Sequence, residues 1–315
     1  MQRIIVFGKS KRRTRTTFHI VRAFKERGNR VLWLNPAKIR RRKKREADQW
    51  IQNQIDYFKP NIIFIYSKDI PLRILQYISA SRIKTVQYYE DMANDISPSL
   101  IQMGKQVDFF LATNKGLIDE YRRAGVVNPI YFVGACDRHD HRRRHPLLSI
   151  WKSEIAFIGR ARSNETRVTL TRKLSEQFNV KVYGKAWRKF GLKPTMKTVT
   201  PRSYGLICAG AKIILGADFT NEVEGYWSNR LWLTLGCGGF FLTQYVKGME
   251  EYFENKKHLV WYHNEQECLN LAEQYIARPR ERRQIAQQGY HLVHAHHTFH
   301  HFVDRVTSLC TQGTF

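Results

Sequence analysis

Two runs of cationic side chains give the clearest chemical signal in this sequence. KSKRRTRTT (9–17) follows the apolar run RIIVFG (3–8), and AKIRRRKKRE (37–46) follows RVLWLNP (30–36). Residues 1–48 hold 17 Lys and Arg against 3 Asp and Glu, a net of 17 − 3 = +14 out of +26 for the whole chain. Clustered cations bind nucleic acid, anionic membrane surfaces and acidic polymers. We therefore expect a polyanion-binding surface that contains Lys9, Lys11, Arg12, Arg13, Arg15, Arg40, Arg41, Arg42, Lys43, Lys44 and Arg45. A solvated charge run with no specific target is the alternative.

Two neighbouring carboxylates in YYEDMAND (88–95) form a second candidate site. They follow an apolar run, where Asp91, or else Glu90, could accept a proton from a hydroxyl nucleophile as a general base. The same two residues could instead cap the helix that follows. The histidines of HLVHAHHTFHH (291–301) do not indicate a metal site, because no carboxylate or cysteine completes a set of ligands. The five cysteines form no CxxC pair, so we expect buried free thiols.

Alternating strands and helices must position these residues. Short apolar runs predict strands at 3–8, 30–36, 61–67, 84–91, 107–114 and 128–135, and again at 153–159, 178–184, 211–217, 238–243 and 258–262. Nearly continuous apolar strands between helices indicate α/β architecture with parallel sheets covered on both faces. Ligands bind at the carboxyl ends of such strands, so we expect both basic runs to be loops at the ligand-binding edge. The polar segment DRHDHRRRHPLL (137–148) breaks the pattern and is interpreted as a linker between two domains.

The second half of the chain also resembles a known family. The residues concerned are IAFIGRA (155–161), VKVYGKAW (180–187), SNRLWLTLGCGGFFLT (228–243), EYF (251–253) and the segment from HLVWYHNEQECL to HAHHTF (258–299). Over most of residues 151–306 this pattern is similar to the C-terminal domain of CgeB-like (spore-maturation-type) glycosyltransferases of the GT-B group. The resemblance implies a GT-B fold, in which two Rossmann-like domains face each other across a cleft. Residues 1–145 would be the acceptor domain and 146–300 the donor domain, with a terminal helix at 301–315 packing back toward the first domain.

The resemblance also implies a nucleotide-sugar donor, with a UDP-sugar favoured, and no prosthetic group. The donor diphosphate needs backbone N–H groups and cations, with Arg230 as the first candidate. No DxD motif indicates a metal-bound donor. Many relatives carry a Glu that holds the donor ribose where this chain has Leu233 or Thr234, so Glu222 or Glu224 is the expected substitute. The implied donor-binding set is Gly159, Arg160, Gly184, Lys185, Trp187, Glu222, Glu224, Ser228, Asn229 and Arg230.

Simpler structural roles remain open for several of these residues. Gly159 and Gly184 could be tight turns, Asn229 an N-cap, and Arg230 a surface residue of the predicted helix 230–237.

The function that these features favour is transfer of a sugar to a polyanionic acceptor. DNA with a hydroxymethylated base comes first, by similarity to phage GT-B enzymes that glycosylate such a base. A cell-envelope or membrane-associated acceptor comes second, and a non-catalytic nucleic-acid-binding protein on a GT-B fold comes third. Retaining and inverting chemistry are both open. No run approaches the roughly 18 apolar residues of a membrane span, and MQRIIVFGKS is no signal peptide, so we expect a cytoplasmic protein with peripheral membrane contact allowed.

Overall fold

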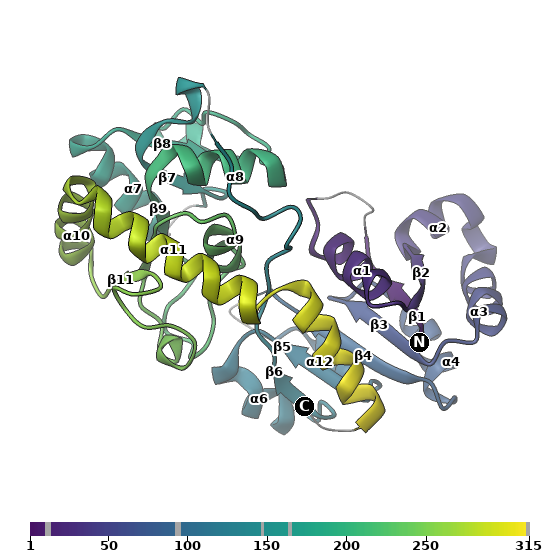
Figure 1. Ribbon diagram of the computed structural model, residues 1–315. Coiled ribbons are helices and arrows are strands. Elements are labelled where there is room, and N and C mark those ends of the chain that lie inside the picture. The colour runs from purple at the N-terminus through teal and green to yellow at the C-terminus, as the bar shows by residue number, and fades with distance from the viewer. Residues whose placement is uncertain (10–13, 92–95, 146–147, 163–165, 313–315) are drawn as a thin grey trace. The chain divides into compact units, whose positions relative to one another are not determined.

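The computed structural model describes residues 1–9, 14–91, 96–145, 148–162 and 166–312 of the 315. It divides into two compact units (Figure 1). The first comprises Met1–Gly134 together with the chain from Phe299 onward, and the second comprises Ala135–Thr298. Three of the predicted polyanion-binding residues, Lys11, Arg12 and Arg13, lie outside the described residues.

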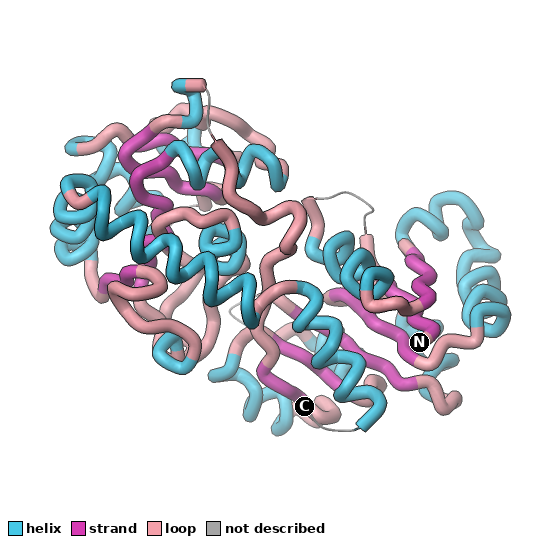
Figure 2. Tube along the Cα trace, in the orientation of Figure 1, coloured by secondary structure: helices cyan, strands magenta, loops and turns pink. Residues whose placement is uncertain are grey.

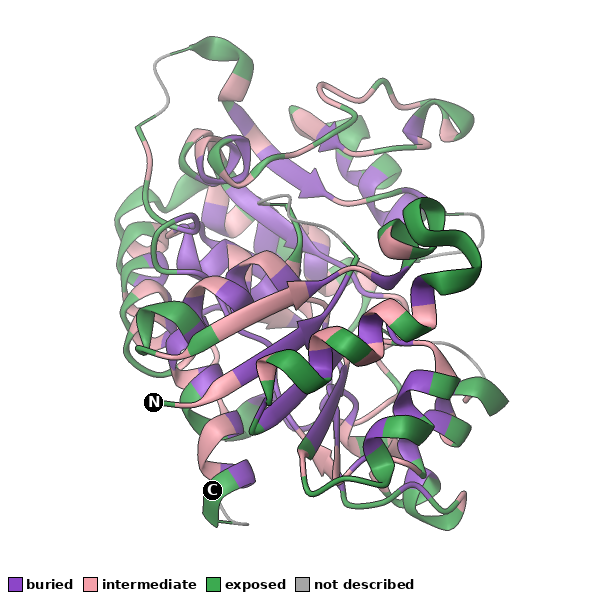
Figure 3. Cartoon of the chain, turned by 90° about the vertical axis from the view of Figure 1, so that its right-hand side faces the viewer, coloured by how far each residue is buried: buried purple, intermediate pink, exposed green. Residues whose placement is uncertain are grey.

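The first unit is built on a six-stranded parallel sheet in the order β2-β1-β3-β4-β5-β6. Its strands are β1 (Arg3–Phe7), β2 (Arg30–Leu34), β3 (Ile62–Tyr66), β4 (Lys84–Tyr89), β5 (Phe109–Ala112) and β6 (Pro129–Tyr131). Each lies within one of the six apolar runs of the first half, which confirms those predictions. The central strands are almost wholly buried, whereas the edge strand β2 is only partly covered (Figure 3).

Helices cover both faces of this sheet (Figure 2). One face packs on α3 (Ala47–Phe58), α4 (Leu72–Ser79) and α5 (Pro98–Gly104) through a single apolar cluster, which also includes Tyr121 of α6 (Ile118–Arg123). On the other face, α12 (Phe299–Gln312) places the ring of Phe302 4.9 Å from that of Tyr88 and 4.7 Å from that of Phe132. Beside it, α1 (Thr16–Glu26) contacts α12. Alternate residues of β3 therefore belong to two different cores, Ile63 and Ile65 to the first and Phe64, whose ring lies 6.1 Å from that of Phe302, to the second.

The second basic run is a helix and not the loop that we expected. α2 (Pro36–Lys43) begins directly after β2 and is followed by a 3-10 turn over Lys44–Glu46. The side chain of Asn35 caps it by accepting a hydrogen bond from the backbone N–H of Lys38 at 3.1 Å, and Pro36 occupies the first turn. The loop prediction was wrong because a capping Asn followed by Pro starts a helix even where its surface carries only like charges.

The second unit repeats the architecture with five parallel strands in the order β11-β10-β9-β7-β8. They are β7 (Ser153–Ile158), β8 (Val180–Tyr183), β9 (Ala211–Gly216), β10 (Phe241–Gln244) and β11 (Val260–Tyr262). All five strand predictions for this half hold, with small shifts at the ends. The helices are α7 (Thr166–Gln177), α8 (Pro201–Gly210), α9 (Arg230–Gly236), α10 (Glu265–Ala277) and α11 (Pro279–His296).

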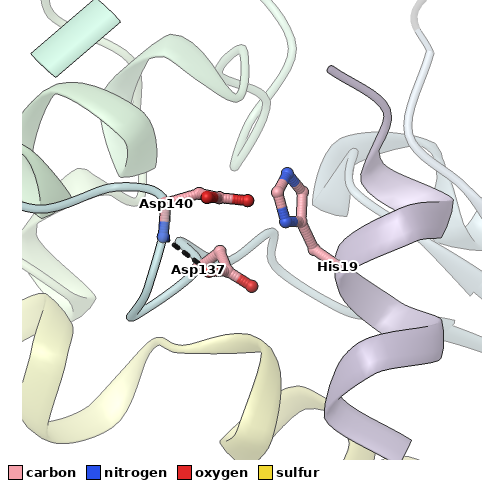
Figure 4. Close-up of side chains that lie close together, drawn as sticks. All are labelled: His19, Asp137 and Asp140. Carbon is pink, nitrogen blue, oxygen red and sulfur yellow. Dashed lines mark hydrogen bonds between the residues drawn. The ribbon is translucent and has the colours of Figure 1, made fainter. Parts of the chain in front are cut away.

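The segment expected to be a linker, 137–148, begins as a buried turn of the second unit. The backbone N–H of Cys136 donates to the carbonyl of His297 at 2.9 Å, which ties the start of this unit to its end. Asp137 is 2% exposed, and its Oδ1 accepts from the backbone N–H of Asp140 at 2.9 Å (Figure 4). The linker interpretation is therefore wrong for these residues, because an Asp that accepts local N–H groups folds a polar sequence into a compact turn.

The bounds of the two units follow from these contacts. The first part of the first unit ends at Gly134, whereas the sequence predicted a boundary at residue 145. The terminal helix α12 starts at Phe299, whereas the sequence predicted a start at residue 301. All five cysteines are free and buried, as expected. Among the described residues, no helix is long and apolar enough to cross a membrane.

Candidate functional site

The carboxyl ends of β7 and β9 form the candidate ligand-binding edge of the second unit. The chain leaves β7 toward β8 on one side, while β9 pairs with β7 on the other side, so the connections diverge between β7 and β9. Open α/β sheets bind ligands at such a point. Gly159 follows β7, and Ala217 and Asp218 follow β9.

Arg230 joins these two strand ends. It is the first residue of α9, and its Nε donates to the carbonyl of Ile158 at 2.8 Å. Its Nη1 donates to the carbonyl of Ala217 at 3.3 Å, and the guanidinium lies over the ring of Phe157, 4.7 Å from its centroid. The side chain is only 8% exposed, so Arg230 is not the surface helix residue of the simpler interpretation.

Asp218 is the partner of Arg230 that the sequence analysis missed. Its Oδ1 lies 3.1 Å from Nη1 of Arg230, and its Oδ2 accepts from the backbone N–H of Ser228 at 3.1 Å. The Asp218 side chain is 7% exposed, and a buried carboxylate requires such pairing. One signal could have found it, since Asp218 is the first carboxylate after the strand predicted at 211–217.

Gly159 and Gly184 let two strand ends approach each other. A Cβ on Gly159 would lie 2.9 Å from the ring of Phe157 and 3.0 Å from Nη2 of Arg230. A Cβ on Gly184 would lie 2.1 Å from the carbonyl oxygen of Gly159, and Gly184 has a φ of +133° that disfavours other residues. Both glycines are therefore needed because a side chain would collide with neighbouring atoms at the edge of the sheet, and not only because the chain turns there.

Trp187 lies in the core of the second unit. It has no exposed surface, its ring packs edge-on to Phe157 at 5.2 Å, and its indole N–H donates to the carbonyl of Gly159 at 2.9 Å. Trp187 thus supports the backbone of Gly159 and, in this structure, offers no ring face to a nucleobase. The exposed cations of Arg160 and Lys185 lie on the adjoining loops, which are joined by a hydrogen bond from Ala161 N–H to the carbonyl of Lys185 at 3.0 Å.

Thr234 cannot replace the Glu of the resembling family. It is fully buried, and its hydroxyl lies 3.0 Å from that of Tyr204. Burial raises the pKa of Tyr204 well above its ordinary value, so this pair remains neutral. Glu222 and Glu224 lie on the loop between β9 and α9, where Glu222 is exposed and Glu224 pairs with Lys247 at 2.9 Å.

The two candidate bases of the first unit have different surroundings. Glu90 follows β4 and accepts hydrogen bonds from the hydroxyl of Tyr66 and from that of Thr16, the latter at 3.0 Å. Asp91 is exposed. Its charge adds to burial in raising the pKa of Tyr89.

The described cations of the predicted polyanion surface are all exposed. Arg40 to Arg45 lie on the second half of α2 and on the turn after it. Lys9 follows β1, and its ammonium pairs with Asp69 at 2.9 Å. Arg15 precedes α1.

Comparison with known proteins identifies the fold and the class of enzyme. Residues 162–308 match the model of a family described as glycosyl transferase-like. Sucrose-phosphate synthase from Thermosynechococcus elongatus aligns over 99% of both chains with a TM-score of 0.72 and 9% identity. An alpha-glucosyltransferase, solved with UDP-glucose and DNA containing an abasic site, aligns over 98% of both chains (TM-score 0.69, 9% identity). The chain is a glycosyltransferase of the GT-B fold.

Other matches agree with this assignment. Anabaena Alr3699/HepE, solved with UDP and glucose, aligns over 98% of the present chain and 100% of its own chain, with a TM-score of 0.68 and 10% identity. No curated protein matches the sequence. The predicted GT-B fold and the predicted glycosyltransferase class are thus confirmed.

Proposed function

We propose that this glycosyltransferase transfers a sugar from a UDP-sugar to DNA that carries a hydroxymethylated base. The observation that carries the proposal is the exposed run of six cations at 40–45, on the helix and turn that follow β2 in the first unit. Such a run suits the phosphates of a duplex. The similarity to an alpha-glucosyltransferase solved with UDP-glucose and DNA supports the same acceptor. Within the GT-B group we propose a CgeB-like subfamily.

The donor would lie at the edge formed by β7 and β9. The exposed Arg160 and Lys185, on the two adjoining loops at this edge, would supply positive charge to the diphosphate. These cations would stabilise the negative charge that develops on the departing nucleoside diphosphate. Arg230 would fix the two strand ends, and Glu222 or Glu224 would hold the ribose.

The acceptor hydroxyl needs to lose a proton during transfer. In an inverting reaction Asp91 would take that proton, because its carboxylate is exposed, whereas two hydroxyls already occupy Glu90. A base inside a duplex is out of reach, so the modified base would be flipped out of the stack.

Binding and transfer test the proposal separately. Thermal-shift titration with UDP-, GDP- and ADP-sugars should show stabilisation by a UDP-sugar only. Transfer of labelled sugar should then occur to hydroxymethylated duplex DNA and not to the same duplex without the modification. A protein that binds DNA but no nucleotide sugar would be the non-catalytic alternative. Donor binding without DNA binding at low salt would point instead to a cell-envelope acceptor.

Substitution of Asp91 tests the proposed base. Asp91→Asn should lower kcat by roughly 100-fold while the dissociation constant for the UDP-sugar stays unchanged. Glu90→Gln is the matched control, because it makes the same change at the neighbouring residue. A kcat that falls for Glu90→Gln and not for Asp91→Asn would assign the base to Glu90. Unchanged kcat in both variants would remove these carboxylates from the reaction.

A further inference from the structure

A small cavity opens at the carboxyl edge of the first unit, beside the run of cations. Its volume is about 190 Å³. Three elements contribute its cations, namely the loop after β1 with Lys9, helix α2 with Arg40 and the loop after β3 with Lys68. The remaining lining residues are Pro36, Ala37, Asp69, Ile70 and Pro71.

The position of the cavity matches the place where this kind of sheet binds ligands. The strand order β2-β1-β3 means that the chain connections diverge between β1 and β3. Lys9 follows β1, and Lys68 follows β3. Open α/β sheets hold ligands outside the carboxyl ends of the two strands at such a point.

The charge of the cavity favours an anion. Among the described lining residues Asp69 is the only carboxylate. Its side chain is 3% exposed, and it accepts both the backbone N–H of Lys9 at 3.0 Å and the Lys9 ammonium at 2.9 Å. That pair is neutral as a unit, which leaves Arg40 and Lys68 in excess. The Arg40 side chain is 60% exposed and lies 3.8 Å from Asp48, a distance too long for a strong ion pair. Lys68 donates to the hydroxyl of Ser97 at 3.2 Å, a neutral partner.

The size of the cavity limits what the anion can be. Pockets for whole drug-sized ligands start at roughly 300 Å³. A cavity of about 190 Å³ suits a single phosphate group with its immediate substituents. Arg and Lys together recognise phosphate oxygens by charge-assisted hydrogen bonds.

We propose that the cavity lined by Lys9, Arg40 and Lys68 holds one phosphate group of the acceptor. This inference rests on the proposed function, since it takes the first unit as the acceptor-binding unit. The proposal gives the cations at 40–45 two different roles. Arg40 contacts one phosphate in a fixed place, whereas Arg41 and the cations after it attract the acceptor by charge alone. A phosphodiester of DNA and a phosphate on a smaller acceptor present the same chemistry to the cavity, and the experiment below distinguishes them.

Neighbouring residues of α2 provide a matched test. Arg40→Met and Arg41→Met remove the same charge one residue apart, but only Arg40 lines the cavity. Lys68→Met removes the second cation from a different element. Binding of inorganic phosphate to the full chain is measured by calorimetry with UDP present to fill the donor site, and binding of duplex DNA by fluorescence anisotropy over a range of salt concentrations. UDP binding to each variant confirms that its second unit is folded. Circular dichroism shows whether the helices and strands of the whole chain, including the first unit, are retained.

We expect Arg40→Met and Lys68→Met each to weaken inorganic phosphate binding about tenfold, with Arg41→Met unchanged. For DNA binding, log of the association constant falls as log of the salt concentration rises. Each of the two cavity variants should make this slope less steep by about 1. Equal loss of phosphate binding in Arg40→Met and Arg41→Met would overturn the cavity site. Phosphate binding that depends on Arg40 and Lys68 in a protein that binds no DNA would support the cavity and reject DNA as the acceptor. DNA binding that falls alike in all three variants would support a DNA acceptor and reject the cavity.

Discussion

At the scale of single residues, the second unit contains a buried ion pair that ties two strand ends together. Arg230 and Asp218 are 8% and 7% exposed, and between them they engage the backbone of Ile158, Ala217 and Ser228. A buried pair contributes little net stability compared with apolar residues, but loss of one partner leaves an uncompensated charge. The pair therefore fixes the geometry of the edge on which Gly159 lies.

A double-mutant comparison tests this interpretation. Arg230→Met should lower the free energy of unfolding by about 3–5 kcal/mol, because Asp218 is then buried without its partner. Asp218→Asn combined with Arg230→Met should cost less than Arg230→Met alone. Urea unfolding of the unsubstituted protein, the two single variants and the double variant gives these values. A double variant as unstable as the sum of the single variants would show that the two side chains act independently.

The site residues that could be found from the sequence lie at the ends of strands and helices, whereas those that were missed depend on contacts between residues distant in sequence. Arg230 and Gly159 could be found because they lie at element ends, where strand and helix patterns are visible. The burial of Trp187 could not be found, because it depends on Phe157 of β7 and on Gly159 just after it, about thirty residues away in sequence. Asp218 was missed for the same reason, since its importance comes from Arg230, twelve residues away in sequence.

At the scale of elements, the strands were predictable and the helical segments less so. Each of the eleven predicted apolar runs contains or overlaps a strand, because a strand buried on both faces has a nearly continuous apolar sequence. α2 was not predicted, since its cations suggested a solvated loop, while the cap formed by Asn35 decides the conformation. The turn at Asp137 was taken for a linker because its hydrogen bonds are invisible in composition.

A side chain that joins two strands allows a pH prediction. Asp108, just before β5, accepts from the backbone N–H and hydroxyl of Thr85 in β4 at 2.8 and 2.7 Å, and lies 3.3 Å from the ammonium of Lys84. Burial alone would raise the pKa of Asp108, but the hydrogen bonds from Thr85 and the charge of Lys84 outweigh it, so this pKa lies below its ordinary value. The stabilisation is therefore complete above about pH 4 and is lost as the pH falls through the folded-state pKa.

Asp108→Asn should remove that contribution. At pH 7 we expect a loss of roughly 1–2 kcal/mol in the free energy of unfolding, mainly from the hydrogen bonds to Thr85. The difference from the unsubstituted protein should shrink between pH 4 and pH 2, which urea unfolding across this range would measure. Asp119→Asn is the control, because the Asp119 side chain is 82% exposed and joins no strands. A difference that stays constant with pH would exclude titration of Asp108 as the cause.

At the scale of the whole molecule, the chain returns to its first unit at the end. α12 belongs to the same compact unit as residues 1–134, although 164 residues of the second unit, Ala135–Thr298, lie between them in sequence. Phe302 of α12 is 3% exposed and contacts the rings of Phe64, Tyr88 and Phe132. The stability of the first unit therefore depends on a helix that follows the whole second unit in sequence.

Hydrogen exchange measured separately over the two units tests this dependence. Phe302→Ala leaves a cavity that costs about 3–5 kcal/mol, so it should increase exchange in β3, β4 and α1 while β7 and β9 keep their protection. Phe240→Ala is the matched variant of the second unit, where Phe240 is 4% exposed and packs 4.9 Å from Tyr275, and it should have the opposite pattern. UDP should add protection around Gly159 in the unsubstituted protein and in Phe302→Ala alike, because the proposed donor site draws its residues from the second unit. If Phe302→Ala exposed both units equally, the two would unfold as one cooperative body, and the donor site would then depend on α12 as well.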